Sequence, residues 1–266
     1  MGRQRADRLV VERGLAPTRE QARRLILAGE VLADDEPVEK PGSLVRDDTS
    51  LRLRHPRKPY VGRGGEKLQG ALEAFSLDVR GLVALDVGAS TGGFTDCLLR
   101  YGARSVTALD VGKGQLDWKL YSDPRVRVVE GKNARYLNPG DLDLRFDIVT
   151  VDVSFISLTK VLPALIPLVN DQGLILALVK PQFELSPEAI ERGGLVTVKE
   201  HQVQAIVNVA IRASELGLAV RDVVDAPIKG VKGNQEFFLL AQKSPRRGLE
   251  PRAIEERSRR IVGMSS

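Results

Sequence analysis

The segment from Leu85 to Leu99, LDVGASTGGFTDCLL, joins the end of a buried strand to a glycine-rich turn and the start of a helix. The apolar run 82–85 ends at Asp86, and a turn of small residues follows. Apolar residues then recur at helical spacing (Phe94, Cys97, Leu98). This arrangement lets the backbone approach a nucleoside-bearing ligand closely at a helix N-terminus. We therefore predict an α/β fold with a cofactor site at this turn.

The spacing within this turn indicates which cofactor the site takes. A dinucleotide site has the pattern G-x-G-x-x-G, whereas this strand ends in an acid and continues as D-x-G-x-x-x-G-G. An acid at this point suits a ligand with a cationic, methionine-like end, which favours S-adenosylmethionine over NAD. The alternative is a glycine-rich strand–helix turn of another α/β protein. The predicted cofactor-binding residues here are Asp86, Gly88, Ala89, Ser90, Gly92, Gly93 and Phe94.

Two further strands end in side chains that suit a nucleoside. The strand 104–111 ends near Asp110, which is placed to accept hydrogen bonds from ribose hydroxyls. The strand 125–129 is followed by Asn133, which could meet an adenine edge. Either residue taken alone could be a turn residue. Because the carboxyl ends of adjacent parallel strands meet at one edge of a sheet, we predict that both contribute to one nucleoside pocket.

The composition is that of a soluble, cytoplasmic protein. The chain has 266 residues, 42% hydrophobic and 28% charged, which is enough for one sizeable domain and a small one. A single cysteine rules out an internal disulfide framework, and two distant histidines give no metal site. The most apolar region, 161–179, is interrupted by prolines and polar residues, so we expect no membrane span. The net charge of +5 suggests a polyanionic partner.

The N-terminal part has a sequence pattern of its own. We divide the chain into a domain over residues 1–58, a domain over residues 59–243, and a basic tail over residues 244–266 that has no assigned role. A short helix from Ala6 ends at Gly14, and Thr18 is a suitable N-cap for a helix over 20–28. Short strands follow near 31–32 and 50–53. Seven arginines lie within the first 25 residues, against three acids. Such segregation indicates a phosphate-facing surface, although each arginine taken alone could belong to a solvated face.

The run from Arg5 to Leu32, with R-A-D-R-L-V and R-E-Q-A-R-R-L-I-L-A-G-E-V-L, resembles the α+β RNA-binding module of ribosomal protein S-four, the alpha-L motif. The resemblance implies that arginines of the two helices contact structured RNA. At the matching positions these are Arg8, Arg19, Arg23 and Arg24.

The remaining strands carry charged residues at their ends. The fourth strand, 147–152, ends at Asp152, and the apolar fifth strand, 173–180, ends at Lys180. Strands over 218–224 and 234–242 complete a seven-stranded, mostly parallel Rossmann-like sheet. Ligands bind at the carboxyl ends of such strands, and a buried lysine is costly unless it is paired or neutral. A purely structural Lys180–Asp152 ion pair is the alternative.

Four residues in these surroundings, Lys67, Asp152, Lys180 and Glu236, resemble the K-D-K-E tetrad of FtsJ-type ribose 2′-O-methyltransferases. The runs V-G-R-G-G-E-K-L, V-D-V-S-F-I-S-L and L-V-K-P-Q-F-E, together with the N-terminal module, are similar to the TlyA family. That family comprises rRNA (cytidine-2′-O)-methyltransferases, also labelled haemolysins. The resemblance covers residues 3 to about 243. It implies S-adenosylmethionine as cofactor, ribosomal RNA or ribosomal subunits as partner, and these four residues as the catalytic set.

The reaction would require a ribose hydroxyl to lose its proton while it attacks the methyl group. Lys180 is the predicted base, with Lys67 as the neighbouring cation that favours its neutral form. Asp152 would hold Lys180 after proton transfer, and Glu236 with Lys67 would orient the ribose. Three other functions are alternatives to methyl transfer: an NAD-dependent dehydrogenase, a membrane-active haemolysin, and a non-catalytic RNA-binding or ribosome-assembly factor. The first lacks the dinucleotide pattern, the second needs a membrane-inserting segment, and the third would not require the tetrad.

Overall fold

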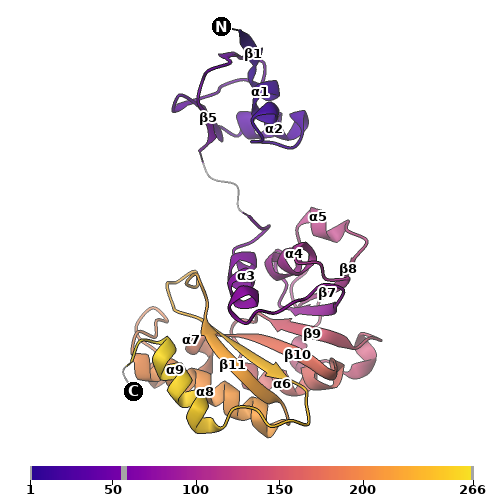
Figure 1. The fold of residues 1–266 in the computed structure, drawn as a ribbon, viewed down its shortest axis with the longest axis vertical. Helices are drawn as coiled ribbons and strands as arrows, with labels where there is room; N and C mark the ends of the chain where they lie inside the picture. Colours follow the sequence, from indigo (N-terminus) through magenta and orange to yellow (C-terminus); the bar gives the residue numbers. More distant parts are fainter. Residues whose placement is uncertain (1, 55–58, 265–266) are drawn as a thin grey trace. The chain divides into compact units, whose positions relative to one another are not determined.

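A computed structural model describes residues 2–54 and 59–264. Contacts divide the chain into two compact units, Met1–Lys58 and Pro59–Ser266, and each is considered by itself (Figure 1). The first unit will be called the N-terminal unit and the second the sheet unit.

The N-terminal unit packs two helices against short strands. Its elements are β1 (Arg3–Arg5), α1 (Ala6–Glu12), α2 (Arg19–Leu27), β2 (Val31–Ala33), β3 (Glu36–Pro37), β4 (Leu44–Arg46) and β5 (Leu51–Leu53). The Thr18 side chain caps α2 by accepting a hydrogen bond from the Gln21 amide at 3.2 Å, as the sequence predicted. The antiparallel pair of β1 and β4 was not predicted, since three-residue strands are too short to show an alternating pattern.

The sheet unit contains a seven-stranded sheet in the order β11-β12-β10-β9-β6-β7-β8. The strands are β6 (Val83–Val87), β7 (Ser105–Asp110), β8 (Val126–Glu130), β9 (Phe146–Val151), β10 (Val169–Val179), β11 (Ala219–Asp225) and β12 (Phe237–Gln242). β12 runs antiparallel to β10 and β11, and the other neighbouring strands pair in parallel, which confirms the predicted mostly parallel sheet. β10 begins at Val169 instead of Gly173, and its register with β9 shifts between Val169 and Leu174.

Helices cover both faces of this sheet (Figure 1). They are α3 (Gly64–Ala74), α4 (Gly93–Arg100), α5 (Trp118–Tyr121), α6 (Leu158–Leu165), α7 (Pro181–Glu184), α8 (Lys199–Glu215) and α9 (Pro251–Ile261). Short 3-10 turns lie at Ala134–Tyr136, Pro139–Asp141, Ile166–Leu168 and Pro187–Ala189.

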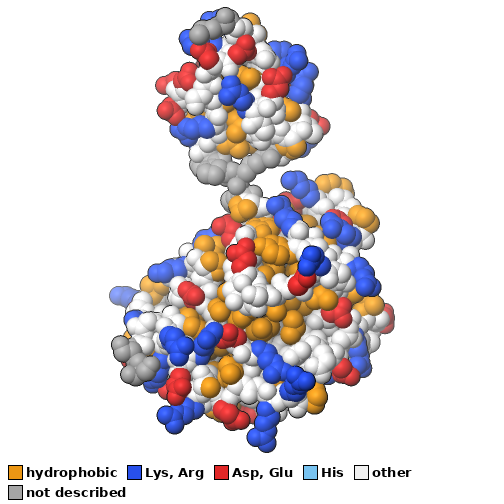
Figure 2. All heavy atoms as spheres, viewed as in Figure 1, with side chains coloured by type: hydrophobic (Ala, Val, Ile, Leu, Met, Phe, Trp, Pro, Cys, Tyr) orange, Lys and Arg blue, Asp and Glu red, His pale blue; other side chains and the backbone are white. Residues whose placement is uncertain are grey.

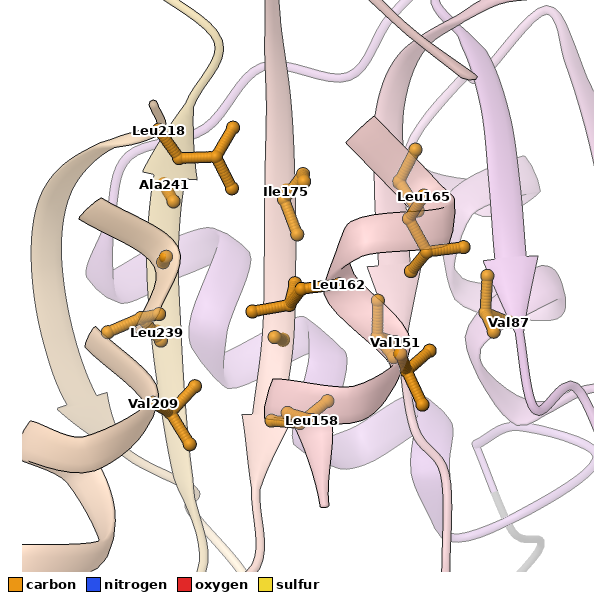
Figure 3. Close-up of a cluster of buried hydrophobic side chains, with 14 of the residues drawn as sticks. Val87, Val151, Leu158, Leu162, Leu165, Ile175, Val209, Leu218, Leu239 and Ala241 are labelled. Atoms are coloured by element: carbon orange, nitrogen blue, oxygen red, sulfur yellow. The ribbon is translucent and has the colours of Figure 1, made fainter. Parts of the chain in front are cut away.

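The two faces of the sheet bury separate hydrophobic clusters. Along β10, Ile175 and Ala177 face the cluster formed with α6 and α8, while Leu176 and Leu178 face the cluster formed with α3 and α4. Figure 3 shows the first cluster, with Leu162 of α6 directed toward the sheet. Successive residues of β10 thus pack on opposite faces of the sheet, and a shift by one residue would exchange the two sets. This alternation fixes the register of the sheet. It thereby fixes where each strand end lies.

The segment after β12 also packs on the sheet unit. α9 contacts α8 and β11, and Arg257 donates to Asp222 at 2.7 Å. The Leu249 amide donates to the Val220 carbonyl at 2.8 Å, which pairs part of the outer edge of the sheet. Covering an edge strand in this way prevents unwanted pairing with other chains.

Candidate active site

Two adjoining cavities lie at the carboxyl ends of the central parallel strands. The larger has a volume of about 690 Å³ and the smaller about 540 Å³. The residues that line both are Gly88, Ser90, Asp152, Ser154 and Phe155. Strand ends from β6, β7, β9 and β10 therefore surround one continuous site, as expected for an open parallel sheet.

A first lysine–acid pair lies in the larger cavity. Lys67, in the first turn of α3, donates from Nζ to Oε2 of Glu236 at 2.6 Å, and the two side chains are only 10% and 4% exposed. Glu236 directly precedes β12, and the turn at Gly230 packs against it. A Cβ on Gly230 would come within 2.4 Å of Glu236 Oε1, so only glycine leaves room for this carboxylate.

A second lysine–acid pair lines the same cavity. Lys180, at the end of β10, lies 2.6 Å from Oδ1 of Asp152 at the end of the neighbouring β9. Its Nζ also donates to the Ser154 hydroxyl at 2.9 Å. The structure thus brings all four tetrad residues to one cavity wall as two pairs, Lys67 with Glu236 and Lys180 with Asp152. Two cations and two anions in a largely desolvated place interact far more strongly than they would in water.

The residues predicted for a nucleoside line the smaller cavity. Asp110 and Asn133 both border it, together with Gln115. The Asp110 carboxylate accepts hydrogen bonds from the amides of Ser90 and Gly112, each at 2.7 Å. These bonds fix the carboxylate, and each of its oxygens retains a second lone pair for a ligand hydroxyl. These two acceptor oxygens therefore fit the hydroxyl groups of a ribose diol. The Asn133 oxygen caps the turn at Ala134–Tyr136 by accepting from the Arg135 amide at 3.0 Å.

The residues of the glycine-rich turn that were predicted to bind the cofactor fall into two groups, those that line a cavity and those that do not. Gly88, Ala89, Ser90, Gly93 and Phe94 line one cavity or both. Gly92 does not; it lies under α5, where a Cβ would come within 2.2 Å of the Leu120 side chain. Gly88 has φ of +85°, and a Cβ there would lie 2.3 Å from the Asp152 carbonyl oxygen. Glycine at 88 thus lets the turn pack directly on the end of β9.

Asp86 does not line either cavity, which differs from the direct cofactor contact expected from the sequence. The residue is fully buried, and its carboxylate accepts from Thr95 Oγ1 at 2.7 Å and from Thr150 Oγ1 at 3.3 Å. Burial raises the pKa of the Asp86 carboxyl to about 7. Because its side chain faces two hydroxyls beneath the turn, Asp86 ties β6 to α4 and β9 in this structure.

The segment that follows β9 contacts the segment that follows β10, and the sequence did not reveal this contact. Besides the Lys180 contacts, Phe155 packs on Phe183 with ring centroids 5.3 Å apart. Ser157 donates to Glu184 at 2.6 Å, and the other Glu184 oxygen accepts from the Leu158 amide at 2.9 Å, which caps α6. Burial raises the pKa of Glu184. The two runs lie 27 residues apart at Ser157 and Glu184, and no sequence pattern signalled this contact.

The four arginines predicted to bind RNA lie in the N-terminal unit. Arg8 pairs with Glu12 at 3.1 Å and Arg24 with Glu20 at 2.5 Å, both across one helical turn. The Arg19 guanidinium donates to the buried Asp7 at 3.1 Å, which gives this residue a structural contact inside the unit. Arg19, Arg23, Arg24, Glu20 and Leu27 line a surface hollow on α2.

Within residues 2–54 and 59–264, no group of three or more acidic, histidine or cysteine side chains is arranged to hold a metal ion. Among the helices of the same ranges, none is both long enough and apolar enough to cross a membrane.

Comparison with known proteins agrees with this geometry. The FtsJ-like methyltransferase model matches residues 60–243, and the S4 domain model matches residues 4–50. The 16S/23S rRNA (cytidine-2′-O)-methyltransferase TlyA of Mycobacterium tuberculosis is 44% identical over 98% of this chain and 97% of its own. Hemolysin A of Brachyspira hyodysenteriae is 37% identical over 88% of this chain and 98% of its own.

A solved structure from Streptococcus thermophilus, which also carries the name hemolysin, is 41% identical with a TM-score of 0.73, covering 98% of this chain and 96% of that one. The matches therefore span both units, and the FtsJ-like match contains both cavities and all four tetrad positions. The chain belongs to the FtsJ-like methyltransferase family and, with its S4 domain, to the group of full-length relatives that includes TlyA.

Proposed function

We propose that the chain transfers a methyl group from S-adenosylmethionine to a ribose 2′-hydroxyl of ribosomal RNA, on cytidine. The observation that carries the proposal is the pair of buried lysine–acid contacts in a cavity that adjoins a nucleoside-type pocket. The name of the Mycobacterium tuberculosis relative supports the choice of rRNA and cytidine. Such a substrate would place the protein in the cytoplasm.

S-adenosylmethionine, when bound, supplies an electrophilic methyl group on a sulfonium. For this chain, Asp110 would hold the ribose hydroxyls of the cofactor, and Asn133 would face its adenine. The turn residues Gly88 and Ser90 border both cavities, so they would hold the cofactor where the two cavities join. Ala89, Gly93 and Phe94 would close the larger cavity beside it, while Asp86 and Gly92 keep the turn in shape.

The two lysine–acid pairs would divide the work on the substrate. Lys180, in its neutral form, would accept the proton of the 2′-hydroxyl, and Asp152, paired with it at 2.6 Å, would stabilise the ammonium that forms. Lys67 and Glu236, held by their mutual hydrogen bond, would orient the ribose through its oxygens. Alignment of hydroxyl and methyl group would supply much of the remaining acceleration.

Features at the cavity rim and in the N-terminal unit suit an RNA substrate. The Phe155 side chain is 91% exposed at the rim, which provides an aromatic surface on which a base turned out of a helix can stack. In the N-terminal unit, the exposed Arg8, Arg23 and Arg24 would contact phosphates, with Arg19 beside them on α2.

The test is single-turnover methyl transfer to ribosomal subunits and to free rRNA from cells that lack the gene, with the modified position mapped. A 2′-deoxy substitution at that position should abolish transfer. Lys180→Arg keeps a cation opposite Asp152 but cannot deprotonate near neutral pH. We expect this variant to lose roughly 10²- to 10⁴-fold in rate, with cofactor and RNA affinities little changed.

Lys160→Arg is the matched control, since Lys160 is exposed on α6 and lines neither cavity. If Lys180→Arg retained more than about a tenth of the wild-type rate, Lys180 would not be the base. Methylation of a base instead of the ribose, or no methylation of any rRNA, would overturn the proposed function itself.

A further inference from the structure

Two aromatic side chains of the sheet unit are exposed without serving its core. Trp118 and Tyr121, at the two ends of α5, lie three residues apart on one side of the helix. Their rings stack at a centroid distance of 5.8 Å and an angle of 14°, with 74% and 54% exposure. Figure 2 shows hydrophobic side chains flanked by basic ones at the surface where Figure 1 places α5. We call Trp118 and Tyr121 the aromatic step.

The aromatic step is firmly attached to the cofactor turn. Leu120, between the two rings in sequence, is buried, and with Leu116 it fills the space above Gly92. The Asp117 amide donates to the Thr91 carbonyl at 3.1 Å, and the Asp117 carboxylate caps α5 by accepting from the Lys119 amide at 2.9 Å. Leu120 of α5 and Leu116 before it therefore anchor the helix, and the aromatic step is free to contact a partner.

The charges near the aromatic step favour an anionic partner. Lys119, which follows Trp118 in α5, is exposed, and among residues 59–264 it forms no ion pair with a carboxylate. The neighbouring acids are already engaged: Asp117 caps α5, and Asp123 pairs with Arg125 at 2.7 Å. Nearly parallel, exposed rings beside an unpaired lysine combine the two elements by which proteins hold single-stranded nucleic acid, a stacking surface and a cation for phosphates.

We propose that the aromatic step binds an unpaired nucleobase of the substrate RNA, one that is not the methylated nucleotide, while Lys119 contacts an adjoining phosphate. The inference rests on the proposed function, because it takes RNA as the substrate. Because α5 is attached to the cofactor turn, this contact would hold RNA that leaves the cavity at a fixed distance from the transferred methyl group.

Trp118 is the only tryptophan of the chain, so its fluorescence reports on this site alone. The full-length protein is titrated at constant salt with an oligouridylate and with an abasic ribose-phosphate oligomer of equal length and charge. We expect the oligouridylate to quench the emission and the abasic oligomer to leave it nearly unchanged. Equal responses to both would reduce the site to a phosphate contact and overturn the proposal.

Affinities of variants then test the contribution of stacking. Trp118→Ala should weaken binding of a labelled oligouridylate by roughly tenfold, whereas Trp118→Phe, which retains a ring, should bind nearly as well as the wild type. Both variants should keep the cofactor affinity, since Trp118 lines neither cavity. In methyl transfer, the RNA concentration at half-maximal rate should rise for Trp118→Ala, with the maximal rate preserved.

Two results would overturn this inference while leaving the proposed function intact. The first is a wild-type protein that methylates rRNA although Trp118→Ala binds RNA as tightly as the wild type. The second is Trp118 emission that responds to S-adenosylmethionine or to added protein and never to RNA. Absence of methyl transfer by the wild type would instead count against the proposed function.

Discussion

The N-terminal unit and the sheet unit each bury one aspartate completely, and the two carboxyls behave in opposite ways. Asp7, in α1, accepts hydrogen bonds from the guanidinium groups of Arg5 and Arg19, which hold its pKa down at about 2. Asp86, at the end of β6, accepts hydrogen bonds from the hydroxyls of Thr95 and Thr150, and its burial, together with the nearby negative charge of Asp152, raises its pKa to about 7.

The comparison shows that burial alone does not decide the charge of a carboxyl group. In the N-terminal unit, arginines whose outer parts are exposed compensate the buried anion, so charge is shared between the interior and the surface. In the sheet unit, the cations Lys67 and Lys180 are buried as well, but they are committed to Glu236 and Asp152. Within residues 59–264 no cation pairs with Asp86, which can therefore hold a proton near neutrality.

The largest expected effect concerns Asp86. Its pKa in the folded state lies above the usual 3.8, so the folded protein holds a proton that the unfolded chain has released. The free energy of unfolding should therefore fall as pH rises from about 4 to about 7, by an amount on the order of 4 kcal/mol. Asp86→Asn should remove this fall, as measured by urea unfolding across that range.

The exposed substitution Asp143→Asn serves as the control for Asp86→Asn and should leave the pH dependence as it is in the wild type. A wild-type protein whose stability rises over the same pH range would mean that Asp86 is ionised throughout. The contrast with Asp7 would then disappear.

Asp110 extends the comparison of the two buried aspartates to an acid whose carboxylate borders a cavity, so its role can be tested by ligand binding. Asp110→Ala should remove a charge-assisted hydrogen bond worth roughly 1.5–3 kcal/mol and weaken S-adenosylmethionine binding at least about tenfold. The affinity is measured by calorimetric titration with S-adenosylmethionine. NAD is titrated separately, as the ligand that the alternative dehydrogenase function would require. Unchanged affinity in this variant would remove Asp110 from the proposed cofactor site.

Asp7 should show the reverse pH dependence, with a smaller amplitude. Because the pKa of Asp7 is lowered, its ion pairs stabilise the folded state above about pH 4, and this contribution is lost as pH falls toward about 2. Asp7→Asn should cost about 1–2 kcal/mol near neutral pH, since solvent screens the exposed arginines. Hydrogen exchange of amides in α1 and α2 measures this locally. Equal protection in variant and wild type would show that the arginines contribute no net stability.

The smallest effect on stability is expected for Arg23→Ala combined with Arg24→Ala. Both side chains lie on the surface of α2, so we expect no measurable change in unfolding. The dependence of RNA affinity on salt should flatten by up to about two units on a log–log plot, with cofactor binding intact. An unchanged slope would assign these two arginines to a solvated face.

The sequence was sufficient where a pattern repeats and insufficient where a contact is made once. Apolar runs predicted the strands, and the Thr18 cap predicted the start of α2. The basic segment after residue 243 has few apolar residues, mainly Ile254 and Ile261, and gave no sign that α9 packs on the sheet unit.

Side-chain direction was the second kind of information that the sequence lacked. An acid at the end of the first strand predicted a ligand contact, but whether a strand-end side chain points into a cavity or beneath a turn depends on packing. Thr95 and Thr150, which hold Asp86, carry no pattern. The contact of Ser157 with Glu184 likewise joins two runs whose separation in the chain hides their proximity.

The order of the sheet has a consequence for how the protein is made. β12 is the last strand to leave the ribosome, yet it lies between β10 and β11 in the finished sheet. Until residues 237–242 have been synthesised, β11 has no strand to pair with and one side of β10 remains open. Glu236, the partner of Lys67, arrives at the same moment. Translation therefore delivers the last member of the tetrad together with the strand that closes the sheet, and no shorter nascent chain has a complete site.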